Sequence, residues 1–154
     1  LKENVVVLMA ARLIYTKGVR EFVLAAKQLI STGVKAEFWL AGEIDTASPA
    51  RINRSEIGEW ERDGIVKHLG FCNDISTTIS QSNIVVLPSY REGFPKVLIE
   101  AAACGRPIVT TDVPGCRDAI VDGVTGLLVP LGDINQLASA LKRLIEDQKL
   151  CEAM

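Results

Sequence analysis

The sequence has few of the residues that hold metal clusters or disulfide frameworks. It contains one histidine, His68, and four cysteines with no C-x-x-C spacing among them. This pattern encodes neither a zinc cluster nor a set of disulfides. Reduced thiols are typical of cytoplasmic proteins, so we expect a cytoplasmic location. The cysteines are Cys72, Cys104, Cys116 and Cys151.

A long apolar run and a surplus of positive charge are also missing. No apolar stretch approaches the roughly 18 residues that a membrane span requires, and no signal-peptide pattern opens the chain. The 17 basic residues face 19 acidic ones, which gives a formal net charge of -2 and argues against nonspecific binding of nucleic acid. If the full-length protein associates with the inner face of a membrane, residues outside this chain would have to mediate that association.

The residues that are present suit one globular domain. Of the 154 residues, 48% are hydrophobic and 23% are charged, which is enough for a substantial core without disulfides. The chain begins at Leu1 rather than at methionine. We interpret it as an excised domain and expect its function to need a part of the protein outside these residues.

Apolar runs alternate with helical patterns along the chain. Residues 4–11 form a continuous apolar run, typical of a strand that is buried on both faces of a parallel sheet. Helical periodicity follows and ends at Gly33. Further strands are predicted at 35–42, 65–69, 83–88, 107–111 and 126–129, and helices at 55–63, 73–80, 95–104 and after Asp133. This order predicts an α/β fold with a doubly wound parallel sheet of about six strands, whose ligands bind beyond the carboxyl ends of the strands.

One helix start at that edge suits an anion. Pro95 fits the first helical position, because its missing N–H would have no partner there. The amides of Lys96, Val97 and Leu98 would then point out of the helix, where the helix dipole favours phosphate. Gly93 would let a ligand approach the backbone closely.

Two cations follow the first strand in "ARLIYTKG", residues 11–18. Arg12 and Lys17 could clamp a diphosphate, Arg12 through a fork of donors and Lys17 as a point charge. The alternative is that both are ordinary solvated charges. A second anion site at the helix start favours the clamp.

Glu92 and Glu100 bracket this helix start. Glu100 lies in an otherwise apolar run, where an unpaired buried carboxylate is costly, so it should line a cleft or meet donors such as the two hydroxyls of a ribose. The alternative is an exposed stripe of the helix. Glu92 lies in the loop and could accept hydroxyls of a group attached to the phosphate. The spacing therefore predicts a nucleotide sugar as the ligand.

These motifs resemble a known enzyme family. "REGFPKVLIEAAACGRPIVTTDVPG" resembles the E-x7-E signature of family 4 retaining glycosyltransferases of the GT-B type. "ARLIYTKG" is similar to their G-R-L-x-x-x-K-G element and "DGVTGLLVPLGD" to their D-G-x-T-G-x-L-V-x-x-G-D segment. The resemblance implies that residues 1–154 are the C-terminal, donor-binding, Rossmann-like half of a two-domain enzyme, with an N-terminal acceptor domain outside this chain.

The resemblance also implies roles for the site residues. Arg12 and Lys17 would contact the donor diphosphate and stabilise it as it departs. Glu92 would meet the sugar without acting as a nucleophile, and Glu100 would hold the ribose. The other donor contacts would be Gly93, Phe94 and Pro95 at the sugar, Lys96 and Val97 at the phosphate, and Gly70 and Phe71 beside the base.

The implied reaction is retaining transfer of a sugar from a nucleoside diphosphate, with UDP favoured, to a glycan or lipid-linked acceptor. The leaving phosphate would take the acceptor proton, and neither a metal nor another cofactor is implied. The segment 43–63 and the "YREGFP" wording resemble transferases that assemble bacterial capsule, O-antigen or other surface glycans. The chain alone is expected to bind UDP weakly and to transfer nothing.

The chain departs from the family pattern at three points. Ala11 replaces the usual glycine before Arg-Leu, and residues 42–45 lack the common G-[DE]-G, which leaves base contacts there open. Asp118 stands where glutamate is usual. The stretch 43–54 is the least regular of the sequence and is expected to be a mobile surface loop.

Alternatives from other classes stay open. A receiver-like regulatory module would need an acidic cluster after the first strand, where this chain has Ala11 and Arg12. A GT-B epimerase would use more carboxylates and histidines, and a phosphorylase would need a cofactor-bearing lysine. A nucleotide-binding scaffold without transferase activity is compatible with the sequence.

Overall fold

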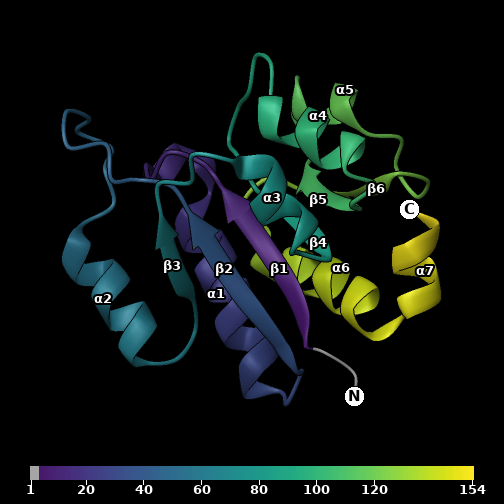
Figure 1. Cartoon of the computed structure of the whole chain (residues 1–154), viewed down its shortest axis with the longest axis horizontal. Coiled ribbons are helices and arrows are strands. Elements are labelled where there is room, and N and C mark those ends of the chain that lie inside the picture. Colours follow the sequence, from purple (N-terminus) through teal and green to yellow (C-terminus); the bar gives the residue numbers. More distant parts are fainter. Residues whose placement is uncertain (1–3) are drawn as a thin grey trace.

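Six parallel strands form one sheet in the order β3-β2-β1-β4-β5-β6 in the computed structural model, which describes residues 4–154. The strands are β1 (Val5–Ala10), β2 (Ala36–Ala41), β3 (Lys67–Gly70), β4 (Ile84–Leu87), β5 (Ile108–Thr111) and β6 (Gly126–Val129). The helices are the 3-10 helix η1 (Tyr15–Lys17), α1 (Val19–Ser31), α2 (Arg54–Arg62), α3 (Ile75–Ser80), α4 (Lys96–Ala103), α5 (Cys116–Ala119), α6 (Ile134–Glu146) and α7 (Gln148–Ala153). Helices α1 and α6 pack together on one face of the sheet, and α3 and α4 on the other (Figure 1).

The two central strands are apolar on both faces because helices cover both faces. Val7, Leu8 and Met9 of β1 are fully buried, as are the first three residues of β4. Strand β1 pairs in parallel with β2 on one side and with β4 on the other. The chain therefore reverses its direction across the sheet between β1 and β4, and in such folds ligands bind at this switch point, beyond the carboxyl ends.

The predicted α/β fold and its elements are confirmed. All six strands and the five long helices are present, with ends within two residues of the prediction. Two of these helices begin at capping aspartates: Asp74 accepts a hydrogen bond from the Thr77 amide, and Asp133 accepts one from the Gln136 amide. The short elements η1 and α5 were not predicted, because three or four residues are too few to show a helical period; α7, which is as long as the predicted α3, was also missed.

The irregular stretch 43–54, which was predicted as a mobile surface loop, is partly buried. The stretch is irregular, but two isolated bridges join Leu13 to Ile44 and Ile14 to Arg51. The Ile52 side chain is fully buried, and its amide donates to the Leu13 carbonyl at 2.9 Å. The residues that follow β1 thus anchor this loop at both ends, a long-range pairing that hydrophobic periodicity cannot reveal.

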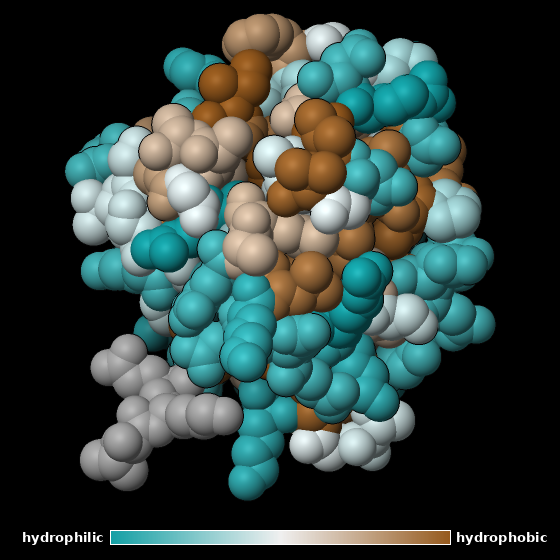
Figure 2. Space-filling model, turned by 90° about the vertical axis from the view of Figure 1, so that its right-hand side faces the viewer, coloured by the Kyte–Doolittle hydropathy of each residue, from teal (hydrophilic) through white to brown (hydrophobic). Residues whose placement is uncertain are grey.

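The face at the right of Figure 1 includes α5, the edge strand β6 and α7. Figure 2 shows apolar side chains gathered in the upper middle of this face, with hydrophilic ones on either side and over most of the lower half. Val121 and Val124, in the turn before β6, are each 59% exposed.

Within residues 4–154, no helix has the length and apolar character needed to cross a membrane.

Candidate functional site

A cleft of about 540 Å³ opens at the carboxyl edge of the sheet. It lies beyond the ends of β1 and β2, between the loop that follows β2 and the helices α3 and α4. Parallel strands bring these separate segments to one edge, which is why residues far apart in sequence share the cleft. Its lining comprises residues 10–12, 41–46, Phe71, Cys72, Ile75, Val97 and Glu100.

Glu100 faces this cleft from α4, as its position in an apolar run predicted. It is half-buried, and no hydrogen bond or ion pair of its carboxylate is found among the described residues. The neighbouring apolar residues Leu98 and Ala101 are fully buried in the core, so the helix turns Glu100 away from them. Its oxygens are available to accept hydroxyl donors from a ligand in the cleft.

The start of α4 supplies two amides and not three. Pro95 is the residue before the helix, and its carbonyl accepts the Leu98 amide at 3.0 Å, so the prediction of a free Leu98 amide is wrong. Among residues 4–154, no group accepts from the amides of Lys96 and Val97. These two N–H groups, at the positive end of the helix dipole, are suited to an anion.

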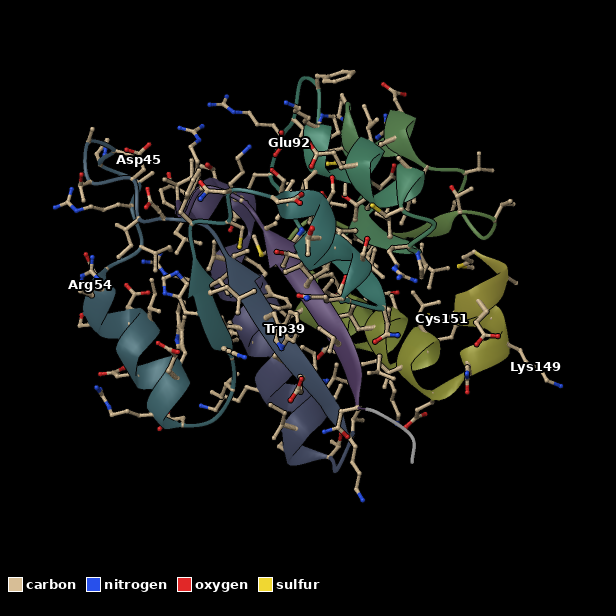
Figure 3. The ribbon with its side chains drawn as sticks, viewed as in Figure 1. Trp39, Asp45, Arg54, Glu92, Lys149 and Cys151 are labelled. Atoms are coloured by element: carbon tan, nitrogen blue, oxygen red, sulfur yellow. The ribbon has the colours of Figure 1, made fainter. Side chains whose placement is uncertain are left out.

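Arg12 also lines the cleft, where it forms an ion pair. Its Nη1 is 3.2 Å from Oδ2 of Asp45, with 66% of the Arg12 side chain and 25% of the Asp45 side chain exposed. Asp45 belongs to the loop after β2 and was not among the predicted site residues. Figure 3 shows it on that loop, on the carboxyl side of the sheet.

Lys17 and Glu92 form a second, more buried ion pair. Lys17 Nζ lies 2.7 Å from Glu92 Oε1, and only 21% and 9% of the two side chains are exposed. The prediction treated them as separate contacts to phosphate and sugar. The structure instead joins them, so the loop before α4 is fixed to the segment after β1.

The loop that carries Glu92 rests on the turn after β5. A Cβ built on Gly115 would lie 2.2 Å from the Glu92 carbonyl oxygen, so only glycine allows this approach. Thr111 at the end of β5 donates to the Ser89 carbonyl of the same loop. Cys116 is buried next to this turn, and burial raises the pKa of its thiol. The sequence did not predict this contact between the turn and the Glu92 loop.

The structure brings together some of the predicted site residues and separates others. Arg12, Phe71, Val97 and Glu100 line the cleft, while Lys17 and Glu92 form the buried pair beside the helix start. Gly70 does not line the cleft; its carbonyl accepts the Gly42 amide at 2.7 Å and supports the loop after β2. The remaining predicted residues lie at the loop and helix start outside the cleft lining: Gly93, Phe94, Pro95 and Lys96. Cleft residues that the prediction missed include Ile44, Asp45, Thr46 and Ile75.

The described residues hold no group of three or more His, Cys, Asp or Glu side chains that could bind a metal ion.

Tyr90, in the loop before Glu92, is tied to helix α1. Its hydroxyl donates to Glu21, and this hydrogen bond raises the pKa of Tyr90 to about 12. The folded pKa exceeds the ordinary value of about 10, so the stabilising contribution is full below pH 10 and is lost as pH rises to about 12. We expect a native-state phenolate titration to show a late component that Tyr90→Phe removes. A late component that persists in Tyr90→Phe would contradict this assignment.

Comparison with known proteins assigns the chain to a family. Residues 4–147 match the family model described as "Glycosyl transferases group 1". The chain belongs to this glycosyltransferase family. Its six-stranded, Rossmann-like sheet is the C-terminal type of half-domain in the GT-B architecture, as the sequence motifs implied.

Relatives of this glycosyltransferase domain include bacterial glycan enzymes. The N,N'-diacetylbacillosaminyl-diphospho-undecaprenol alpha-1,3-N-acetylgalactosaminyltransferase of Campylobacter jejuni is 39% identical over 145 residues, which cover 94% of this chain and 36% of the relative. The capsular polysaccharide biosynthesis glycosyltransferase CapM of Staphylococcus aureus is 30% identical over 154 residues, covering 100% of this chain and 40% of the relative. The chain thus spans about two fifths of these relatives.

A solved structure of Anabaena HepE in complex with UDP has the same fold. It superposes with a TM-score of 0.86 at 27% identity, covering 97% of this chain and 41% of that chain. The half-domain described here therefore shares the fold of a protein that was solved with bound UDP.

Proposed function

We propose that this domain binds a nucleoside-diphosphate sugar, with UDP as the favoured nucleotide, for retaining transfer by the full-length enzyme to a glycan or lipid-linked acceptor. The observation that carries the proposal is the unpaired Glu100 carboxylate in the cleft, one helical turn from the free amides of Lys96 and Val97. A carboxylate for a ribose diol beside donors for phosphate is the arrangement that a nucleotide requires.

Related proteins support the choice of ligand and acceptor. The Anabaena relative was solved with UDP and also with UDP-glucose. The Campylobacter relative is named for a diphospho-undecaprenol compound and the Staphylococcus relative for capsular polysaccharide. We extend these ligand and acceptor classes to this chain as part of the proposal.

Each site residue then contacts a different part of the ligand. Glu100 accepts hydroxyls of the ribose, and the amides of Lys96 and Val97 hold phosphate oxygens. Arg12 stabilises negative charge on the departing diphosphate across the cleft. The Lys17–Glu92 pair lies at the sugar end, where Lys17 adds positive charge and the second Glu92 oxygen accepts sugar hydroxyls.

Calorimetric titration with UDP, GDP and ADP tests this site. We expect UDP to bind the wild-type chain and Glu100→Gln to weaken binding by roughly ten- to a hundredfold, the effect of losing hydrogen bonds to a charged acceptor. Glu59→Gln is the matched control, because Glu59 is an exposed glutamate on α2, outside the cleft. Absence of binding by all three nucleotides would overturn the donor-site proposal.

Transfer is a separate expectation. The chain spans about two fifths of its relatives, and we expect the acceptor site to lie in the rest of the full-length protein. Incubation of this chain with UDP-sugars and a lipid-linked acceptor should therefore yield no product. Detectable transfer would contradict the expectation that the chain alone is inactive.

A further inference from the structure

The charge of the cleft is poorly matched to the ligand proposed for it. Within residues 4–154, Arg12 is the one cationic side chain of the lining, whereas three carboxylates take part in it. The acidic residues are Glu43, Asp45 and Glu100. A diphosphate brings further negative charge into the cleft. Its affinity therefore depends on whether the Arg12 guanidinium is free to bind it.

The Asp45 carboxylate already accepts a hydrogen bond from the Arg12 guanidinium. The Arg12 Nη1 to Asp45 Oδ2 distance of 3.2 Å is a hydrogen-bonded ion pair, and both residues line the cleft. A diphosphate oxygen that approaches the Arg12 guanidinium must therefore compete with the Asp45 carboxylate for one of its N–H groups.

Asp45 is held in place rather than resting on Arg12 by chance. Its other oxygen, Oδ1, accepts the Ala47 amide at 3.2 Å, and its carbonyl accepts the Ser48 amide at 3.1 Å. The amide of Leu13, next to Arg12, donates to the Glu43 carbonyl at 3.0 Å, which fixes the loop against the segment after β1. The carboxylate is thus presented to Arg12 by a turn that does not depend on the ion pair.

We propose that Asp45 sets the affinity of the cleft for nucleoside diphosphates by competing with the diphosphate for Arg12. Ligand binding exchanges the Asp45 carboxylate for a phosphate oxygen as the partner of the guanidinium. The Asp45 side chain is already one-quarter exposed, so water solvates its carboxylate after the exchange. This inference rests on the proposed function and adds to it a residue that weakens donor binding.

The exchange is open to solvent, which limits its size. Two-thirds of the Arg12 side chain is exposed, and exposed ion pairs are weak and screened by salt. Removal of the competing carboxylate is expected to strengthen diphosphate binding by roughly three- to tenfold. A neutral nucleoside has no phosphate to bind Arg12, so its affinity should not change.

The test is calorimetric titration of the wild-type chain and the Asp45→Asn variant with UDP and uridine. Asparagine keeps an oxygen for the Ala47 amide, so the turn is retained while the charge is removed. We expect a tighter UDP complex and an unchanged uridine complex. The gain should disappear when Arg12→Ala is combined with Asp45→Asn.

Glu43→Gln is the matched control, because it removes the same charge from the cleft without touching the ion pair. We expect it to alter the UDP dissociation constant by less than about twofold. An equal gain from Glu43→Gln would overturn partner exchange in favour of a general charge effect.

The outcomes also separate the two proposals. UDP binding to the wild type with no gain in Asp45→Asn overturns this inference and leaves the proposed function standing. Absence of UDP, GDP and ADP binding overturns both. In the unmodified chain, the NMR signal of the Arg12 Nε–H should shift with UDP and not with uridine, and an equal response to both would also overturn the exchange.

Discussion

Replacing Gly115 with alanine should lower the free energy of unfolding by about 2–4 kcal/mol and should also weaken UDP binding. The backbone of Gly115 has a φ of 85°, where an L-residue is strained, and the added Cβ would lie 2.2 Å from the Glu92 carbonyl oxygen. The Glu92 loop must move to relieve this contact. Urea unfolding and calorimetric titration of the same variant measure the two effects.

Gly132→Ala separates backbone strain from contact with the loop. Gly132 has a φ of 74°, but a Cβ built there meets nothing within 4 Å. This variant should lose only about 1 kcal/mol and retain UDP affinity. Equal losses of stability in the two variants would show that Gly115 does not support the Glu92 loop.

Replacing Lys17 with methionine is the second large effect, with an expected loss of about 2–3 kcal/mol of unfolding free energy. Methionine keeps much of the packing of the Lys17 chain but leaves the Glu92 carboxylate, whose side chain is 9% exposed, without its cation. An uncompensated buried charge is the main cost. Urea unfolding at neutral pH measures it.

The double variant Lys17→Met/Glu92→Gln tests whether that charge is the cause. We expect it to recover at least about 1 kcal/mol relative to Lys17→Met alone, because no buried charge remains unpaired. Arg117→Met is the control: it breaks a pair with Asp112 in which both side chains are 51% exposed, and it should cost clearly less than Lys17→Met. Additive losses at Lys17 and Glu92 would contradict coupling of the buried pair.

The sequence predicted the framework of this domain well because its signals are local. Continuous apolar runs such as that of β1 indicate strands covered on both faces, and the side chains of Asp74 and Asp133 cap helices within three residues of their own positions. The four-residue helix α5 was not predicted, since one turn carries too few apolar positions, and α7 was missed although Asp147 caps it in the same way.

The site was predicted in part, for the same reason. The placement of Glu100 on a cleft follows from its helix, because the apolar neighbours Leu98 and Ala101 must face the core. The free amides of Lys96 and Val97 follow from the position of Pro95, whereas the use of the Leu98 amide depends on the detailed geometry of the first turn.

By itself, the sequence determined the order of strands and helices, the anion-suited helix start and the glutamate that faces the cleft. Only the tertiary structure decided the partners of the charged groups: Arg12 pairs with Asp45 across 33 positions, and Lys17 with Glu92 across 75. The same holds for the contact of Gly115 with the Glu92 loop. Electrostatic attraction and steric exclusion depend on distance in space, and loops that meet at the end of a parallel sheet acquire that distance only when the sheet has formed.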